Sequence, residues 1–149
     1  MRWSLCGAIV VLALAAGVET RAAQGELLSK RYDFKDRVIL EISQTEPGGL
    51  RLDTVQFDLP SRTGDRLTRV AGLLTARVAV SNTGNESRKV GLAIALFDDE
   101  GRLLAVASGG NKLTPIKPDR QKTFTLVFDG VNAEAHKATA FHISLEPKP

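Results

Sequence analysis

From Val38 onward, apolar residues recur at every second position, and this period of two constrains the fold more than any other feature of the sequence. Successive side chains of a β-strand point to opposite faces of a sheet, so such alternation predicts half-buried strands. We expect regular strands at residues 74–81, 90–97, 103–107, 123–128 and 141–146. Less regular strands are expected at 38–42 and 50–59, and in the second the apolar positions shift phase between Leu52 and Val55, as a β-bulge requires.

Turn-forming residues separate these strands. Residues 46–49, 82–85 and 98–101 combine proline, glycine, asparagine and aspartate, which favour turns because of their backbone geometry or their hydrogen bonds to the local backbone. The 98–101 segment predicts a hairpin in which Gly101 takes a positive φ, and Pro147 is expected to end the fold. We also expect loops at 61–66 and 112–119 and a single helical turn within 132–137. About seven strands without an amphipathic helix predict two antiparallel sheets packed face to face.

Residues 1–23 are predicted to be an export signal peptide. Met1 and Arg2 give a positively charged start, residues 6–18 carry no charge, and small residues around Ala22 and Ala23 offer cleavage positions. The apolar stretch is shorter than the roughly 20 residues that cross a bilayer as a helix, so no stable membrane span is expected after cleavage. Cys6 is the first residue of that stretch, whereas a lipidated cysteine follows it. Cleavage after Ala22, cleavage after Ala23 and retention as an anchor are all compatible with the sequence.

The predicted location is therefore the periplasm or the medium. The single cysteine of the chain lies in the leader, and an exported domain without disulfides is typical of bacteria. Residues 24–36 mix charges of both signs and are interpreted as a polar tether, with the β-sandwich domain at 37–149. The net charge of +3 is too weak for a nucleic-acid-binding surface, and aromatic residues, at 5%, offer few platforms for stacking bases.

No motif of catalysis, cofactor binding or metal binding is recognisable, and we expect a protein that is not an enzyme. His136 and His142 are the only histidines, whereas a zinc site needs three or four ligands. His142 alternates with apolar neighbours and is expected to face solvent. The carboxylates of residues 98–100 are interpreted as turn residues, because a calcium site needs six to eight oxygen ligands. Residues 108–112 are not followed by the helix that a phosphate-binding loop requires.

Three segments resemble a known family. Ile94-Ala95-Leu96-Phe97-Asp98 is similar to the Phe-x-Leu-Tyr-Asp signature of the FxLYD family of small extracytoplasmic bacterial domains, with Ile and Phe at two of its positions. Residues 78–84 resemble that family's valine strand and Asn-Thr turn, and residues 101–104 resemble its Gly-Lys-hydrophobic hairpin. The likeness covers roughly residues 73–146. It implies an immunoglobulin-like antiparallel β-sandwich, and it carries no catalytic residue.

The outward face of the strand at 90–97 is unusual because it lacks charge. Opposite the expected core face it carries Gly91, Ala93, Ala95 and Phe97. A smooth face of small residues accepts a partner protein, an added strand or another segment of the same chain, here the tether or the 61–66 loop. We therefore predict a non-catalytic interaction or assembly module of the bacterial cell envelope, with these four residues as the partner surface. The alternative is a periplasmic carrier that holds a small apolar ligand between its sheets. The partner, the oligomeric state and the strand order are not predicted.

Overall fold

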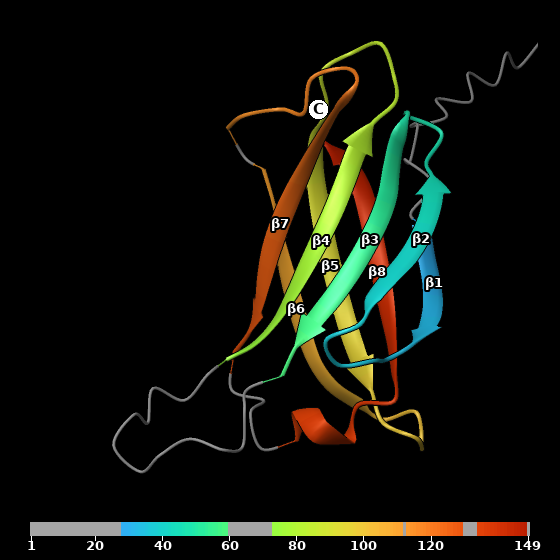
Figure 1. Ribbon diagram of the computed structural model, residues 1–149, viewed down its shortest axis with the longest axis vertical. Coiled ribbons are helices and arrows are strands. Elements are labelled where there is room, and N and C mark those ends of the chain that lie inside the picture. The colour runs from blue at the N-terminus through green and yellow to red at the C-terminus, as the bar shows by residue number, and fades with distance from the viewer. Residues whose placement is uncertain (1–27, 60–72, 112, 130–133, 149) are drawn as a thin grey trace, which may run out of the picture.

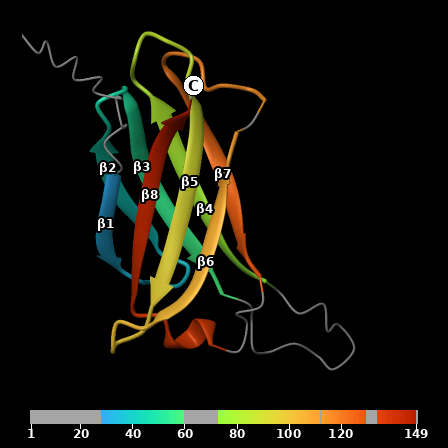
Figure 2. The same cartoon turned by 180° about the vertical axis from the view of Figure 1, so that it is seen from behind.

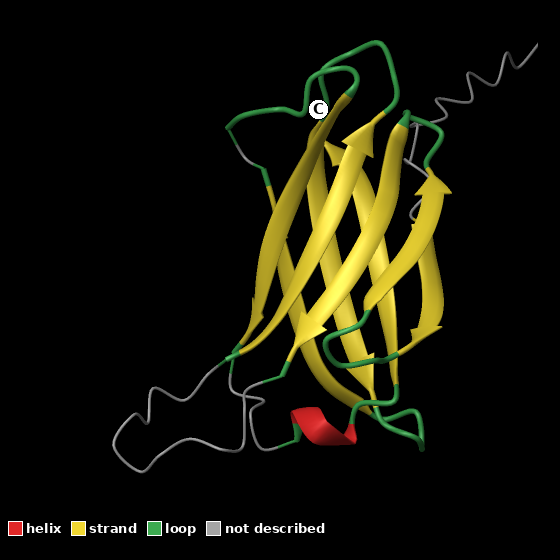
Figure 3. Cartoon of the chain, in the orientation of Figure 1, coloured by secondary structure: helices red, strands yellow, loops and turns green. Residues whose placement is uncertain are grey.

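The computed structural model describes residues 28–59, 73–111, 113–129 and 134–148. It is a sandwich of two four-stranded antiparallel sheets (Figures 1 and 3). Sheet A has the order β1-β8-β5-β6 and faces the viewer in Figure 2, and sheet B has the order β2-β3-β4-β7. The elements are β1 (Leu28–Asp33), β2 (Ile39–Thr45), β3 (Leu50–Asp58), β4 (Leu74–Asn82), β5 (Lys89–Phe97), β6 (Leu103–Gly110), β7 (Arg120–Phe128), the 3₁₀ helix η1 (Ala135–Lys137) and β8 (Ala140–Lys148).

The core lies between the sheets and is built from the alternate positions that the sequence predicts. In β4 and β5 the inward residues are at most 3% exposed: Leu74, Ala76, Val78, Val80, Val90, Leu92, Ile94 and Leu96. Phe57 of β3 packs edge-on against Phe141 of β8 with a centroid distance of 4.9 Å, which joins the two sheets. The predicted fold class, a β-sandwich of antiparallel sheets, is confirmed.

The predicted turns and bulges are also present. Gly49 has a φ of +81° and its N–H donates to the carbonyl oxygen of Glu46 at 3.0 Å. Gly101 has a φ of +78° in the hairpin between β5 and β6. The register of β3 against β4 shifts between Leu52 and Thr54, which is the bulge that the phase change predicts. In the described part of 132–137, η1 is the predicted helical turn.

The tether prediction is wrong for residues 28–33, which form β1 at the edge of sheet A. β1 pairs antiparallel with β8 from Leu28 opposite Leu145 to Asp33 opposite Ala140. An edge strand has a partner on only one side, so Lys30, Arg31 and Asp33 remain exposed and give the segment a composition like that of a tether. The leader, residues 1–23, and the 61–66 loop lie outside the described residues.

Pro147 does not end the fold, because β8 continues to Lys148. It lies opposite Val90 of β5, whose N–H donates to Asn111 Oδ1 at 2.5 Å and whose carbonyl oxygen accepts the Asn111 N–H at 3.0 Å. Both backbone groups of Val90 therefore point away from β8. The Pro147 nitrogen points to the β1 side, where the described pairing stops at Leu145, so its missing N–H costs no bond to β5.

Among the described residues, no helical segment has the length and hydropathy of a membrane span.

Gly49 and Gly101 provide a matched test of the turn geometry. A Cβ at Gly101 meets nothing within 4 Å, so Gly101→Ala introduces only the strain of a positive φ, about 1–2 kcal/mol. A Cβ at Gly49 lies 2.7 Å from the Cα of Gly84, so Gly49→Ala must also displace backbone. We expect Gly49→Ala to lower the free energy of unfolding by about 1 kcal/mol or more beyond the control, measured by urea denaturation. Equal losses for both variants contradict this reading.

Candidate functional site

The outer face of sheet B is mostly polar and internally paired, and its exposed apolar residues, Ile39 and Val127, lie on opposite edge strands. Arg77 of β4 donates to Asp58 of β3 at 2.8 Å. Asp53, at the β3 bulge and 8% exposed, accepts hydrogen bonds from Ser81 Oγ at 2.5 Å, Arg51 Nε at 2.6 Å and Gln121 Nε2 at 2.9 Å. Threonines of β7 complete this face. It has the composition of a sheet face that is exposed to water.

The outer face of sheet A carries the four residues predicted as a partner surface. Ala93, Ala95 and Phe97 of β5 are half-buried there, and Gly91 is buried. A Cβ at Gly91 would lie 2.6 Å from Lys148 Cε, so the Lys148 side chain covers this glycine. The structure therefore brings three of the four residues to an accessible surface and places the fourth beneath a lysine.

Edge strand β6 extends this surface with two residues that the sequence analysis does not single out. Leu103 and Val106 are 58% and 56% exposed, and they lie opposite Phe97 and Ala95 in the register of β5 and β6. Strand alternation places Val106 outward once Ala105 and Ala107 are known to face the core. Ala93, Ala95, Phe97, Leu103 and Val106 together are called the sheet A patch. None of these side chains is charged.

His142 of β8 borders the patch. Its ring lies 5.1 Å from the Phe97 ring, and it is half-buried. It points away from the core as predicted, but Phe97 shields it from part of the solvent. His136 is exposed on η1, on a different element. Within the described ranges, no three histidine, cysteine, aspartate or glutamate residues are grouped in a way that could hold a metal ion.

The carboxylates at the β5–β6 hairpin form the turn that the sequence predicts. Asp98 is 1% exposed and accepts hydrogen bonds from the backbone N–H and the Nε of Arg102, both at 2.8 Å. The side-chain hydrogen bond from Arg102 is the main cause that holds the pKa of Asp98 below its ordinary value, against the opposing effect of burial. The carboxylate of Asp98 therefore stabilises the hairpin turn.

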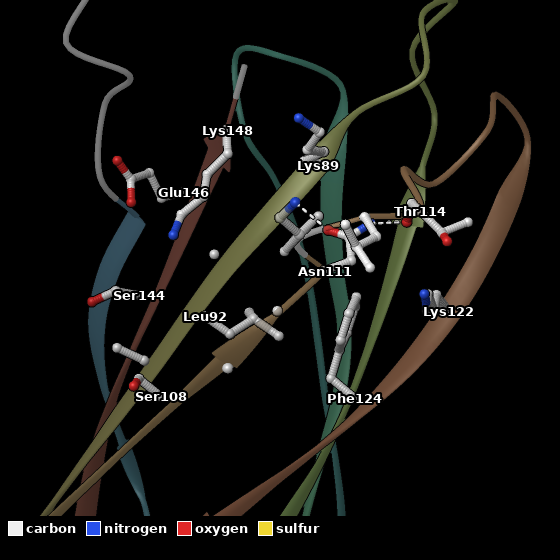
Figure 4. Close-up of a pocket in the computed structure, with 16 residues that line it drawn as sticks. Lys89, Leu92, Ser108, Asn111, Thr114, Lys122, Phe124, Ser144, Glu146 and Lys148 are labelled. Carbon is white, nitrogen blue, oxygen red and sulfur yellow. Dashed lines mark hydrogen bonds between the residues drawn. The ribbon is translucent and has the colours of Figure 1, made fainter.

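An open groove of about 1140 Å³ continues from the patch toward the other end of β5 and β6 (Figure 4). Its apolar lining includes Leu92, Leu113 and Phe124. Three lysines from three strands, Lys89, Lys122 and Lys148, surround it, and Glu146 is the carboxylate in its lining. The Lys122 ammonium lies 5.6 Å from the centre of the Phe124 ring. The groove is therefore apolar at its base with a basic rim.

No protein-family model, curated protein or solved structure matches the chain. The resemblance to the FxLYD family stays a prediction.

The Asp53 network predicts a dependence of stability on pH. Burial by itself raises the pKa of Asp53, but hydrogen bonds from Ser81, Gln121 and Arg51 and the charge of Arg51 together lower it below the ordinary value of 3.8. Its stabilising contribution is thus present above that value and is lost as the pH falls through the lowered folded-state pKa. We expect Asp53→Asn to reduce the free energy of unfolding by about 1–3 kcal/mol at neutral pH, because it weakens the network.

The measurement is urea denaturation of both proteins from neutral to acid pH. The difference between them should shrink at acid pH, and a difference that is constant with pH overturns the prediction. Asp58→Asn is the control, because the pair it removes is exposed at the surface and contributes less than about 1 kcal/mol.

Proposed function

We propose that this protein is an exported, non-catalytic β-sandwich of the bacterial cell envelope that binds a partner protein through the sheet A patch. The observation that carries the proposal is the contrast between the two outer faces. On sheet B, carboxylates, arginines and threonines occupy most outward positions, and the exposed apolar residues Ile39 and Val127 lie apart on opposite edge strands. The sheet A patch instead presents five uncharged side chains on adjacent strands, among them Leu103 and Val106, each more than half exposed.

The composition of the patch supports contact with a protein. Protein interfaces have an apolar centre depleted of charge and a polar rim, and Phe97 with its two exposed aliphatic neighbours supplies such a centre. Arg31 and Asp33 on β1 and Glu146 on β8 are exposed farther out on the same sheet and supply a charged rim. Single exposed apolar residues need no explanation, but contiguous ones on a flat sheet favour a binding surface.

The absence of catalysis is part of the proposal. Asp53 and Asp98, the buried aspartates among the described residues, are each held by several hydrogen bonds within their own turn or sheet, which leaves them no reactive role. The envelope location rests on the features of residues 1–23, and the resemblance to the FxLYD family is compatible with it.

The alternative, a carrier of an apolar ligand, has one observation in its favour. The groove reaches Phe124, whose side chain belongs to the core, and thus opens toward the space between the sheets. Elsewhere in the described core, bulky side chains such as Phe57, Phe128 and Phe141 fill that space. Extra mass on the freshly purified protein in native mass spectrometry supports this alternative, whereas bare protein and no thermal shift with a lipid panel count against it.

Phe97→Glu tests the partner surface. A carboxylate at the centre of an apolar interface must be desolvated on binding, which costs several kcal/mol without a compensating partner. We expect in-cell cross-linking of a tagged chain, followed by mass spectrometry, to recover one reproducible envelope protein with the wild type and to lose it with Phe97→Glu. Circular dichroism should show unchanged strand content, because Phe97 lies outside the core.

Thr125→Glu is the matched control. Thr125 is exposed on the outer face of sheet B, opposite Arg77, so the variant adds the same charge to the other face. It should retain the partner. Equal capture by Phe97→Glu and the wild type rejects the sheet A patch as the contact surface, and a mature N-terminus at Met1 rejects cleavage of the leader.

A further inference from the structure

The four edge strands of the sandwich differ in how they are protected. A sheet edge exposes unpaired backbone groups, and proteins block unwanted pairing with charged residues, bulges or proline. β6, with the sequence Leu-Leu-Ala-Val-Ala-Ser-Gly-Gly, has no charged residue. The other three edge strands each carry at least one charged residue: Lys30, Arg31 and Asp33 in β1, Glu41 in β2, and Arg120 and Lys122 in β7.

The backbone of β6 presents hydrogen-bonding groups along its free edge. Asn111 and Val90 are hydrogen-bonded to each other. Because hydrogen-bonded and non-hydrogen-bonded pairs alternate along an antiparallel ladder, the next hydrogen-bonded pairs of β5 and β6 are Leu92–Gly109 and Ile94–Ala107. The N–H and C=O groups of Val106 and Ser108 therefore point away from β5. Among the described residues, neither of these two has another backbone partner.

The two ends of β6 carry opposite charge. At its start, the hairpin turn carries three acidic residues, Asp98, Asp99 and Glu100, and one basic residue, Arg102, so this end is negatively charged. At its end lies the groove, whose lining has three lysines, Lys89, Lys122 and Lys148, and one carboxylate, Glu146, so this end is positively charged. If a second β6 pairs antiparallel, the acidic turn of each copy lies beside the lysine rim of the other. The charges thus favour antiparallel pairing of β6 with itself and oppose parallel pairing.

We propose that β6 is the edge through which two copies of this chain associate. The strands pair antiparallel about a two-fold axis near Val106, which joins the two A sheets into one continuous sheet. A residue on the two-fold axis lies opposite the same residue of the second copy. A charged residue there would therefore meet a like charge, and the uncharged sequence of β6 avoids this repulsion. The inference goes beyond the proposed function, because a partner can occupy the sheet A patch of a single copy.

The first experiment measures mass by size-exclusion chromatography with light scattering on protein purified from the full-length chain. We expect the wild type to have twice the mass of one chain, with a dimer that weakens on dilution and in high salt. Val106→Lys puts two ammonium groups at the axis and should yield monomer. Val127→Lys, on the edge strand β7 at a residue that is 41% exposed, is the control and should stay dimeric. A monomeric wild type at every concentration overturns the proposal.

Ser108→Pro distinguishes pairing through the free edge of β6 from contact through the sheet A patch. The Ser108 N–H points to the free edge, so proline removes a donor that the second copy needs without breaking a bond to β5. We expect monomer with unchanged strand content. A dimer that persists in both Ser108→Pro and Val106→Lys shows that another surface is used. Loss of the envelope partner in Phe97→Glu is a separate readout, and retention of that partner by monomeric Ser108→Pro leaves the proposed function standing.

Cross-linking tests the register. In a chain with Cys6→Ser, which removes the only native thiol, Val106→Cys places two thiols across the axis. Directly opposed residues of an antiparallel pair have Cα atoms within disulfide reach. Mild oxidation should give a reducible dimer with Val106→Cys and not with Val127→Cys. Equal cross-linking of the two variants contradicts pairing through β6.

Discussion

Phe57 is the side chain on which the packing of the two sheets most depends. Its ring contacts Phe141 of sheet A at 4.9 Å, Phe128 of its own sheet at 6.4 Å, and Phe34, in the connection between β1 and β2, at 4.7 Å. Aromatic pairs of this kind add to the stabilisation from burial alone. The apolar face of every strand must pack against this core. The outward positions are free of that requirement, so the two sheets can differ in polarity and charge only there.

Buried polar side chains fix the ends of the strands around that core. Asn82 Nδ2 donates to the carbonyl oxygens of Glu86 at 2.7 Å and Ile116 at 2.8 Å, and its Oδ1 accepts the N–H of Gly84 at 3.0 Å. Asn111 accepts the Val90 N–H and donates to the carbonyl oxygen of Thr114 (Figure 4). A buried amide keeps its place because an unsatisfied polar group is costly. Asn111 therefore holds the end of β6 against β5, and the groove and the free edge are formed before anything binds.

The sequence is most informative where one face of a strand is buried. Alternation in β4 and β5 identifies every inward side chain, and the glycines at 49 and 101 mark turns because only a positive φ closes them. It is least informative at the edges. β1 has a mixed-charge composition because Lys30, Arg31 and Asp33 face water, and its strand structure comes from backbone pairing with β8. Val106 and Leu103 likewise gain significance only through the register that sets them beside Ala95 and Phe97. The Asp53 network joins residues up to 68 positions apart, and no local sequence pattern predicts it.

The lack of charge on β6 is a local property and not a consequence of overall composition. Charged residues make up 25% of the chain, so an eight-residue strand would carry about two if they were placed evenly, and β6, with five exposed positions, carries none. The strand also lies next to the least charged part of the sheet A face. An open edge and an apolar face side by side expose both unpaired backbone and apolar surface, which in water promotes indiscriminate association. In water, a chain keeps that combination at little cost only if something specific covers it. In the proposed dimer a second copy satisfies the backbone of the edge, and in the proposed function a partner protein covers the face, so the two proposals concern different parts of one uncharged surface.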